Sequence, residues 1–305
     1  MNNLNDFNCE LACITDDCRK YIKCGKVADY IPELAKADIN KLGIYIISKD
    51  NEWFSGDYDT RFTIQSIVKP LILLLALKDS GVERVRSLVG VEATGKPFDT
   101  FNYTDLALKN EHINPMINAG AIALCTLIKG STSREKTNRI LEFTRKLAKN
   151  DLIEIDTVVY LSEKATGNKN RALAYMLNAY KMINEDVEEL LDCYFSACSI
   201  TVNCKDLANI AFALAHCVPN ETINEDDARF VNAILSTCGM YDGSGEFALN
   251  VGVPAKSGVG GGIMAVVPSR MGIGVFSPSL DEKGNSVAGK KLLETISKKM
   301  QLSIF

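Results

Sequence analysis

The residues best suited to chemistry are Ser66 and Lys69, which stand at the start of a long apolar run over residues 70–77. In a helix, their side chains would lie about one turn apart on one face. Serine is a weak nucleophile and needs a base within hydrogen-bond reach. A lysine half-buried among apolar side chains loses hydration that stabilises its ammonium form, which suits it to act as that base. Ser-x-x-Lys is short, however, and taken alone it favours an N-capping serine with a lysine in the first turn.

A second motif, Lys256-Ser257-Gly258, changes that weighting because a glycine-rich stretch and a predicted strand follow it. Ser-x-x-Lys with a partner Lys-Thr-Gly is typical of penicillin-recognising serine enzymes, and Lys-Ser-Gly is a close variant. A strand beside the nucleophile can supply one backbone N–H of an oxyanion hole, and Ser66 can supply the other. Glycines allow a substrate to approach that backbone closely. Together the two motifs favour acyl transfer.

Composition excludes several other classes of function. The 305-residue chain has a net charge of −4 and no basic tract, which argues against nucleic acid as a partner. The run at 70–77 is too short to span a membrane, and no signal peptide is recognisable, so we expect a cytoplasmic protein. Ten cysteines should then be reduced. With only His112 and His216 available, a histidine metal site is not expected, and His112 is a weak catalytic candidate.

The elements that must position these motifs form an α+β pattern. Apolar strands at residues 42–48 and 52–57 predict one hairpin, and strands near 263–267 and 270–277 predict another. Helical patterns fill the region between them, which predicts one antiparallel sheet built from both termini plus an all-helical region. We expect a single domain over 1–305, with an α/β part at roughly 1–75 and 245–305 and a helical part at roughly 76–244.

Three local expectations concern four possible site residues. A short helix over residues 25–35, broken at Pro32, places Tyr30 in an extended or turn conformation. Asn118 either caps the helix that it opens or aims its amide at a ligand. Glu163 and Asn170 lie on a polar loop before a helix at 172–182, either as a ligand clasp or as a solvated loop.

Motifs along nearly the whole chain, from about residue 20 to 280, resemble the serine-dependent glutaminases. In chain order they are residues 25–32 (GKVADYIP), 65–69 (QSIVK) and 114–121 (NPMINAGA), Ser162-Glu163 with Asn170, Tyr194-Phe195 with Cys198-Ser199, Met240-Tyr241-Asp242 with Ser244-Gly245, and 256–262 (KSGVGGG). The resemblance implies a fold like that of serine β-lactamases and penicillin-binding proteins. It also implies hydrolysis of L-glutamine to L-glutamate and ammonia, no cofactor, and a homo-oligomer (dimer or tetramer).

Carried over by position, the resemblance makes Ser66 the nucleophile, Lys69 the general base, and the backbone of Ser66 and Val259 the oxyanion hole. Tyr30 or Tyr241 would relay the proton to the leaving group, and the choice between them stays open. The residues implied for the glutamine pocket are Tyr30, Asn118, Glu163, Asn170, Tyr194, Tyr241 and Val259.

The sequence departs from the family pattern at two positions. Lys169 stands before Asn170 where arginine is usual, and Ala197 stands before Cys198 where glutamine is usual. Two other functions are compatible with the motifs. One is a β-lactamase or penicillin-binding protein, against which the missing signal peptide argues, and the other is a catalytically inactive protein that senses glutamine.

Overall fold

The computed structural model describes residues 4–95, 113–216 and 222–305. Its strands are β1 (Gly43–Ser48), β2 (Glu52–Gly56), β3 (Phe62–Thr63), β4 (Thr201–Val202), β5 (Ala255–Ser257), β6 (Gly262–Val267) and β7 (Met271–Phe276). Its α-helices are α1 (Leu4–Cys18), α2 (Lys69–Leu88), α4 (Asn118–Cys125), α5 (Ser133–Ala148), α6 (Thr157–Thr166), α7 (Asn168–Ala179), α8 (Val187–Cys198), α9 (Cys204–Ala215), α10 (Glu225–Cys238), α11 (Ser244–Asn250) and α12 (Val287–Met300). Short 3-10 helices are η1 (Arg19–Cys24), η2 (Leu34–Lys36), η3 (Gln65–Val68) and η4 (Tyr241–Gly243).

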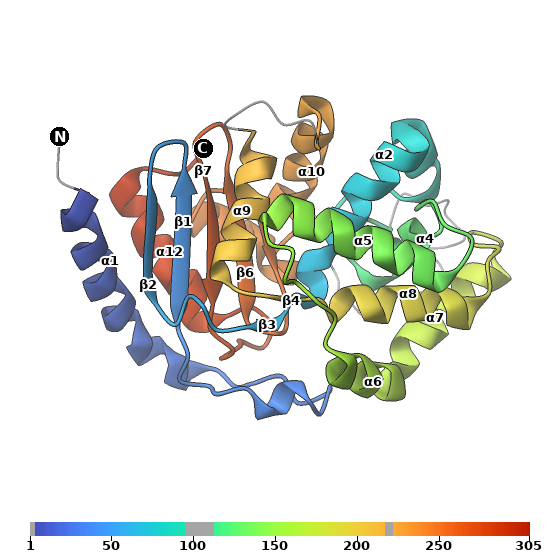
Figure 1. Cartoon of the computed structure of the whole chain (residues 1–305), viewed down its shortest axis with the longest axis horizontal. Coiled ribbons are helices and arrows are strands. Elements are labelled where there is room, and N and C mark those ends of the chain that lie inside the picture. Colours follow the sequence, from blue (N-terminus) through green and yellow to red (C-terminus); the bar gives the residue numbers. More distant parts are fainter. Residues whose placement is uncertain (1–3, 96–112, 217–221) are drawn as a thin grey trace.

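Five strands form one antiparallel sheet in the order β2-β1-β7-β6-β5, and β3 and β4 pair separately. Strands from the N-terminal part of the chain therefore lie beside strands from the C-terminal part (Figure 1). This confirms the predicted α+β fold and both predicted hairpins, β1–β2 and β6–β7. Lys256 and Ser257 of the Lys-Ser-Gly motif lie on the edge strand β5 itself, and the chain turns into β6 from Gly258 onward.

The two faces of the sheet contact different helices because side chains alternate along each strand. Ile44 and Ile46 pack in a cluster with residues of α1 and α12, whereas Tyr45 and Ile47 join the larger cluster that includes α9. Gly272 of β7 permits the close contact with α9, since an added Cβ would lie 2.1 Å from the Phe212 nitrogen. In Figure 1, α1 and α9 lie on opposite sides of these strands.

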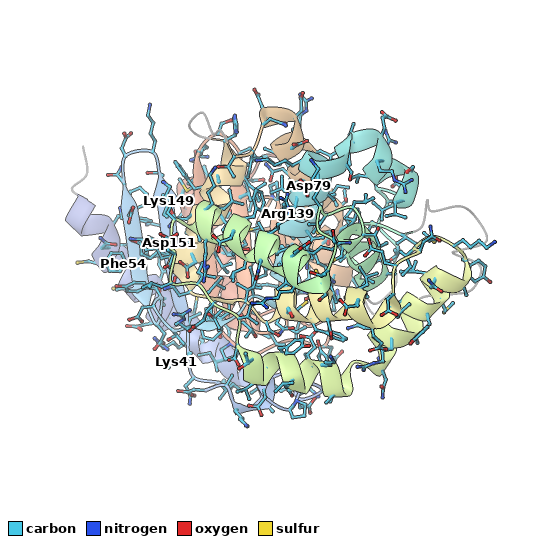
Figure 2. The ribbon with its side chains drawn as sticks, turned by 45° about the vertical axis from the view of Figure 1, so that its right-hand side comes forward. Lys41, Phe54, Asp79, Arg139, Lys149 and Asp151 are labelled. Carbon is cyan, nitrogen blue, oxygen red and sulfur yellow. The ribbon has the colours of Figure 1, made fainter. Side chains whose placement is uncertain are left out.

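Helices α2, α4, α5, α7 and α8 form the other half of the molecule, at the right of Figure 1. Their apolar faces share one core, and an ion pair links the middle of α2 to the middle of α5. In that pair, Arg139 Nη2 lies 2.6 Å from Oδ1 of Asp79, whose side chain is only 4 % exposed (Figure 2). Since η3 and the first turn of α2 lie between this half and the sheet, the Ser66 region touches both.

The structure corrects the predicted helix over residues 25–35. Lys26 instead pairs with Leu280 as an isolated bridge, and a single 3-10 turn forms at Leu34–Lys36. This segment runs across the protein as extended chain, so contacts with a distant part of the sequence overrode its local helical pattern. Tyr30 lies in a bend, as expected for a residue two before proline.

Other predictions had mixed outcomes. The helix after Ser66 extends beyond the apolar run at 70–77: it breaks at Gly81, where φ is 80°, then resumes and continues to Leu88. His216 ends α9 as a left-handed C-cap residue. His112 lies outside the described residues.

Each of the nine cysteines in the described part of the chain is a free thiol. None of the described helices has the length and apolar character needed to cross a membrane.

Candidate active site

Ser66 lies in a tight turn between the two halves of the molecule. The sequence predicted a helix start here, but Ser66 belongs to the 3-10 helix η3, and Lys69 is the first residue of α2. Gln65 has a φ of 49°, a left-handed conformation that costs a non-glycine residue about 1–3 kcal/mol. The Ser66 side chain borders a cavity although the residue is only 7 % exposed. The strained turn therefore presents a hydroxyl to an enclosed space.

Lys69 is completely buried and donates hydrogen bonds to two oxygens. Its Nζ lies 3.1 Å from the Met116 carbonyl oxygen and 2.7 Å from Oδ1 of Asn118. The predicted capping role of Asn118 is wrong, because Ile117 is the N-cap residue of α4 and no side chain caps that end. The Asn118 amide instead points inward, and its Nδ2 donates to Oδ1 of Asn170 at 2.8 Å.

Tyr194 of α8 adds a phenol to this network. Its hydroxyl donates to Oδ1 of Asn118 at 3.3 Å, and the residue is 1 % exposed. Burial raises the pKa of Tyr194 well above its usual value, and nearby Cys198 and Glu163 add to that rise. Tyr194 is therefore a neutral hydrogen-bonding group. Two amides, a phenol and the Lys69 amine form a connected polar wall beside Ser66.

The cavity next to this wall has a volume of about 480 Å³. Its lining contains six residues that the sequence implied for the site: Tyr30, Ser66, Asn118, Glu163, Asn170 and Tyr194. Lys69, Tyr241 and Val259 are buried and are not part of the lining. A volume of this size suits a small metabolite rather than a polymer. The structure thus gathers side chains from η3, α4, α6, α7 and α8 around one small-molecule site.

Glu163 contributes a carboxyl group to the cavity. The predicted loop over Glu163 and Asn170 is wrong, because Glu163 lies in the last turn of α6 and Asn170 in the first turn of α7. Among the described residues, no group donates a hydrogen bond to the buried Oε2 of Glu163. Burial raises the pKa of Glu163 to about 8, although a hydrogen bond from Gln65 and any positive charge on Lys69 act against the rise. An orphaned carboxyl oxygen facing a cavity fits a cationic group of a ligand.

The glycines around Val259 bring its backbone against the nucleophile turn. A Cβ on Gly258 would lie 2.8 Å from the Ile64 carbonyl oxygen, and one on Gly260 would lie 2.6 Å from the Thr63 carbonyl oxygen. Only glycine allows this packing without displacing the chain. Val259 is therefore fixed beside the segment that leads into Ser66.

The two candidate tyrosines occupy different environments. Tyr241 is 9 % exposed, has a left-handed φ of 53°, and its side chain lies close to the Ser66 side chain and the Val259 N–H. Burial raises the pKa of its phenol, and these two neighbours oppose that rise. Tyr30 is 54 % exposed and lines the outer part of the cavity. Their positions differ accordingly, with one phenol inside near the serine and the other nearer solvent.

Gln65 is a lining residue to which the sequence reasoning assigned no role. Its side chain is buried, donates to Thr63 Oγ1 at 3.2 Å, and also hydrogen-bonds Glu163. A polar residue directly before the serine was a usable signal.

Of the two departures from the family pattern, Lys169 lines the cavity. Arg171, two residues later, forms an ion pair in which its Nε lies 3.5 Å from Oε1 of Glu188. Nothing in the structure explains Ala197, which is fully buried in α8.

Comparisons with known proteins agree with this geometry. The Glutaminase family model matches residues 25–305. The chain is 53 % identical to the glutaminase of Clostridium tetani, covering 96 % of this chain and 97 % of that one. It is 52 % identical to the glutaminase of Clostridioides difficile, with 94 % and 95 % coverage.

Solved structures give the same result. A Bacillus subtilis probable glutaminase complexed with 6-diazo-5-oxo-L-norleucine superposes with a TM-score of 0.89 at 36 % identity, covering 98 % of this chain and 97 % of that one. A covalent complex formed by a Bacillus subtilis glutaminase with the same reagent has a TM-score of 0.89 at 35 % identity, with 98 % and 99 % coverage. The fold, the assembled residues and the close relatives together show that this chain is an enzyme of the glutaminase family.

Proposed function

We propose that the protein hydrolyses L-glutamine to L-glutamate and ammonia through a glutamyl ester on Ser66. The observation that carries the proposal is a buried hydroxyl at a cavity of about 480 Å³ that also contains an orphaned carboxyl oxygen. The hydroxyl oxygen would attack the side-chain amide carbon of glutamine. Ammonia leaves as the ester forms, and a water molecule then releases glutamate and restores Ser66.

Lys69 is proposed as the base that takes the Ser66 proton. An uncharged amine has two N–H groups and one lone pair. The Met116 carbonyl and Asn118 Oδ1 accept N–H groups of Lys69 and so orient the amine, and its lone pair would accept the proton of the serine. Complete burial also favours the uncharged form of a lysine.

Proton delivery and oxyanion binding are assigned to groups beside Ser66. The N–H groups of Ser66 and Val259 would stabilise the negative charge on the amide oxygen. Tyr241 is preferred to Tyr30 as the proton relay because it is buried near both of those residues, whereas Tyr30 is mostly exposed. The proton taken by Lys69 would pass through the Tyr241 hydroxyl to the departing nitrogen.

Substrate recognition follows from the polar wall. The Glu163 carboxylate would bind the α-ammonium of glutamine by a charge-assisted hydrogen bond. The amides of Asn118 and Asn170, with Tyr194, would bind the α-carboxylate. Tyr30 would contact the substrate near the entrance. The predicted homo-oligomer and cytoplasmic location stay predictions.

Glutamine affinity should depend on pH through Glu163. Its pKa of about 8 means that the carboxyl is neutral in the free protein at pH 6, so binding an ammonium requires loss of that proton. We expect the affinity of the Ser66→Ala protein to rise by up to about tenfold per pH unit between pH 6 and pH 8, and then to level off. Calorimetry in two buffers of different ionisation enthalpy should detect a proton released on binding below pH 8.

Glu163→Gln is the matched control because it keeps the shape of the side chain and cannot ionise. On the Ser66→Ala background it should weaken glutamine binding at pH 8 and abolish both the pH slope and the released proton. An unchanged affinity at pH 8, or the same slope in both proteins, would contradict the ammonium role of Glu163.

The activity itself is tested by assaying glutamate release from glutamine and asparagine in parallel. Glutamate from glutamine is the expected result, with asparagine much less reactive because its shorter side chain places the amide away from Ser66. Thermal stabilisation by glutamine without any glutamate release would instead indicate a binding protein.

A further inference from the structure

Lys256 of the edge strand β5 is a second buried lysine that the proposed mechanism does not use. The residue is 0 % exposed. Its Nζ donates to the carbonyl oxygens of Gly239 at 3.0 Å and Ser257 at 2.7 Å, and it lies 4.3 Å from the centre of the Tyr241 ring. Three different groups therefore surround one nitrogen atom.

This arrangement fits a protonated Lys256. Two N–H groups satisfy the two carbonyls, as they do for Lys69, but at Lys256 the remaining direction faces the π-electrons of a ring. A third N–H is attracted to an aromatic face, whereas the lone pair of a neutral amine is repelled by it. Burial lowers the pKa of Lys256 well below its usual value, and a positive charge on Lys69 would lower it further. The uncharged Lys69 proposed above removes only that second, smaller effect. Burial, the larger effect, is opposed by the two carbonyl acceptors and the aromatic face, all of which favour the ammonium form of Lys256.

The two carbonyl partners of Lys256 lie just before the two residues proposed to act beside Ser66, Tyr241 and Val259. Gly239 precedes Tyr241 by two residues, and its backbone packs so tightly on β5 that an added Cβ would lie 1.7 Å from the Ala255 carbonyl oxygen. Ser257 precedes Val259 by two residues. Lys256 thus connects the turn that holds the phenol with the strand end that holds the oxyanion N–H.

Tyr241 needs such support because its backbone is strained. A left-handed φ of 53° at a non-glycine residue persists only where surrounding contacts enforce it. Asn285 Nδ2 donates to the Met240 carbonyl at 3.2 Å and Ser244 Oγ to the Tyr241 carbonyl at 2.9 Å, which fixes the backbone of this turn. These bonds hold the main chain, and the ammonium of Lys256 contacts the ring itself.

We propose that Lys256 is a positioning residue for the reaction: its buried ammonium holds the Tyr241 ring against Ser66 and stabilises negative charge on the phenol as it passes on its proton. The inference rests on the proposed relay role of Tyr241. It assigns a function to the lysine of the Lys-Ser-Gly motif that is distinct from that of the glycines after it.

The test compares Lys256→Gln with Lys256→Met. A glutamine amide can donate two N–H groups to the carbonyls of Gly239 and Ser257 but has no charge, whereas methionine removes the hydrogen bonds as well. We expect kcat for glutamine to fall about 10- to 30-fold in both variants, a range that corresponds to loss of a buried cation–π contact. Glutamine affinity, measured on the Ser66→Ala background, should stay within about twofold. If the methionine variant does not fold, the glutamine variant decides the question alone.

A double-mutant cycle then shows whether Lys256 acts through Tyr241. On a Tyr241→Phe background, which loses the relay, Lys256→Gln should lower kcat by less than about twofold. Lys136→Met is the control, because Lys136 is another buried lysine whose Nζ donates to a backbone carbonyl, that of Cys125, at 3.2 Å. It should lower the Tm but leave kcat within about twofold.

The outcomes separate this inference from the proposed function. Wild-type kcat in Lys256→Gln, or an equal loss on both backgrounds, would overturn the positioning role while leaving the Ser66 mechanism intact. Wild-type kcat in Tyr241→Phe would overturn the relay and this inference together. Activity retained by Ser66→Ala would overturn the proposed function itself.

Discussion

Replacing Ser66 with alanine is expected to lower kcat for glutamine by about 10⁵-fold or more, to the limit of the glutamate assay. The change removes the only atom proposed to bond to substrate, and loss of a serine nucleophile elsewhere costs on the order of 10⁶-fold. Ser66 has no neighbour in the turn that could replace its hydroxyl, since Gln65 and Ile67 flank it. Single-turnover assays at high protein concentration would measure the residual rate.

The same variant should remain folded and should still bind glutamine. Recognition is assigned to Glu163, Asn118 and Asn170, which the substitution does not touch. Saturating glutamine at 100 times its Kd should stabilise the variant by about 2.7 kcal/mol, visible as a higher Tm. A folded, glutamine-binding variant that retains substantial turnover would remove Ser66 from the mechanism.

Replacing Lys69 with methionine is expected to lower kcat by about 10³-fold. The variant keeps the apolar stem of the side chain but has no group to take the proton of Ser66, and general-base catalysis typically contributes 10²–10⁴-fold. Met116 and Asn118 each lose the donor that their oxygens accept from Lys69. An unfolding free energy lower by about 1–3 kcal/mol is therefore expected as well, measurable by urea titration.

The loss of activity and the loss of stability can be separated at Lys69. A temperature low enough to keep the variant folded should restore none of the kcat. If kcat recovers once the variant is fully folded, Lys69 supports the site structurally and another group acts as the base.

The sequence predicted the fold well because its strongest signals were local. The apolar strands at 42–48 and 52–57 and near 263–267 and 270–277 predicted both hairpins, and their places toward the two ends of the chain implied a shared sheet. Residues 25–35 were predicted wrongly because their conformation depends on a partner more than 200 residues away, Leu280.

Burial was the property that the sequence could not supply for the site. Glu163 looked like part of a polar loop, yet it is a buried helical residue with a raised pKa. Asn118 looked like a helix cap, yet its amide connects Lys69 with Asn170. Both errors have one cause: a polar residue near a helix end is usually exposed, and only the packing of α4 and of α6 on α8 encloses these two.

The central claim is that Ser66 forms the covalent bond with substrate, and one labelling experiment tests it directly. The reagent 6-diazo-5-oxo-L-norleucine reacts covalently with the Bacillus subtilis relative. Treated with this reagent, the protein should gain a single adduct, peptide mapping by mass spectrometry should locate it on Ser66, and the Ser66→Ala variant should gain none. An adduct on another cavity residue such as Cys198, or equal labelling of the variant, would contradict the account.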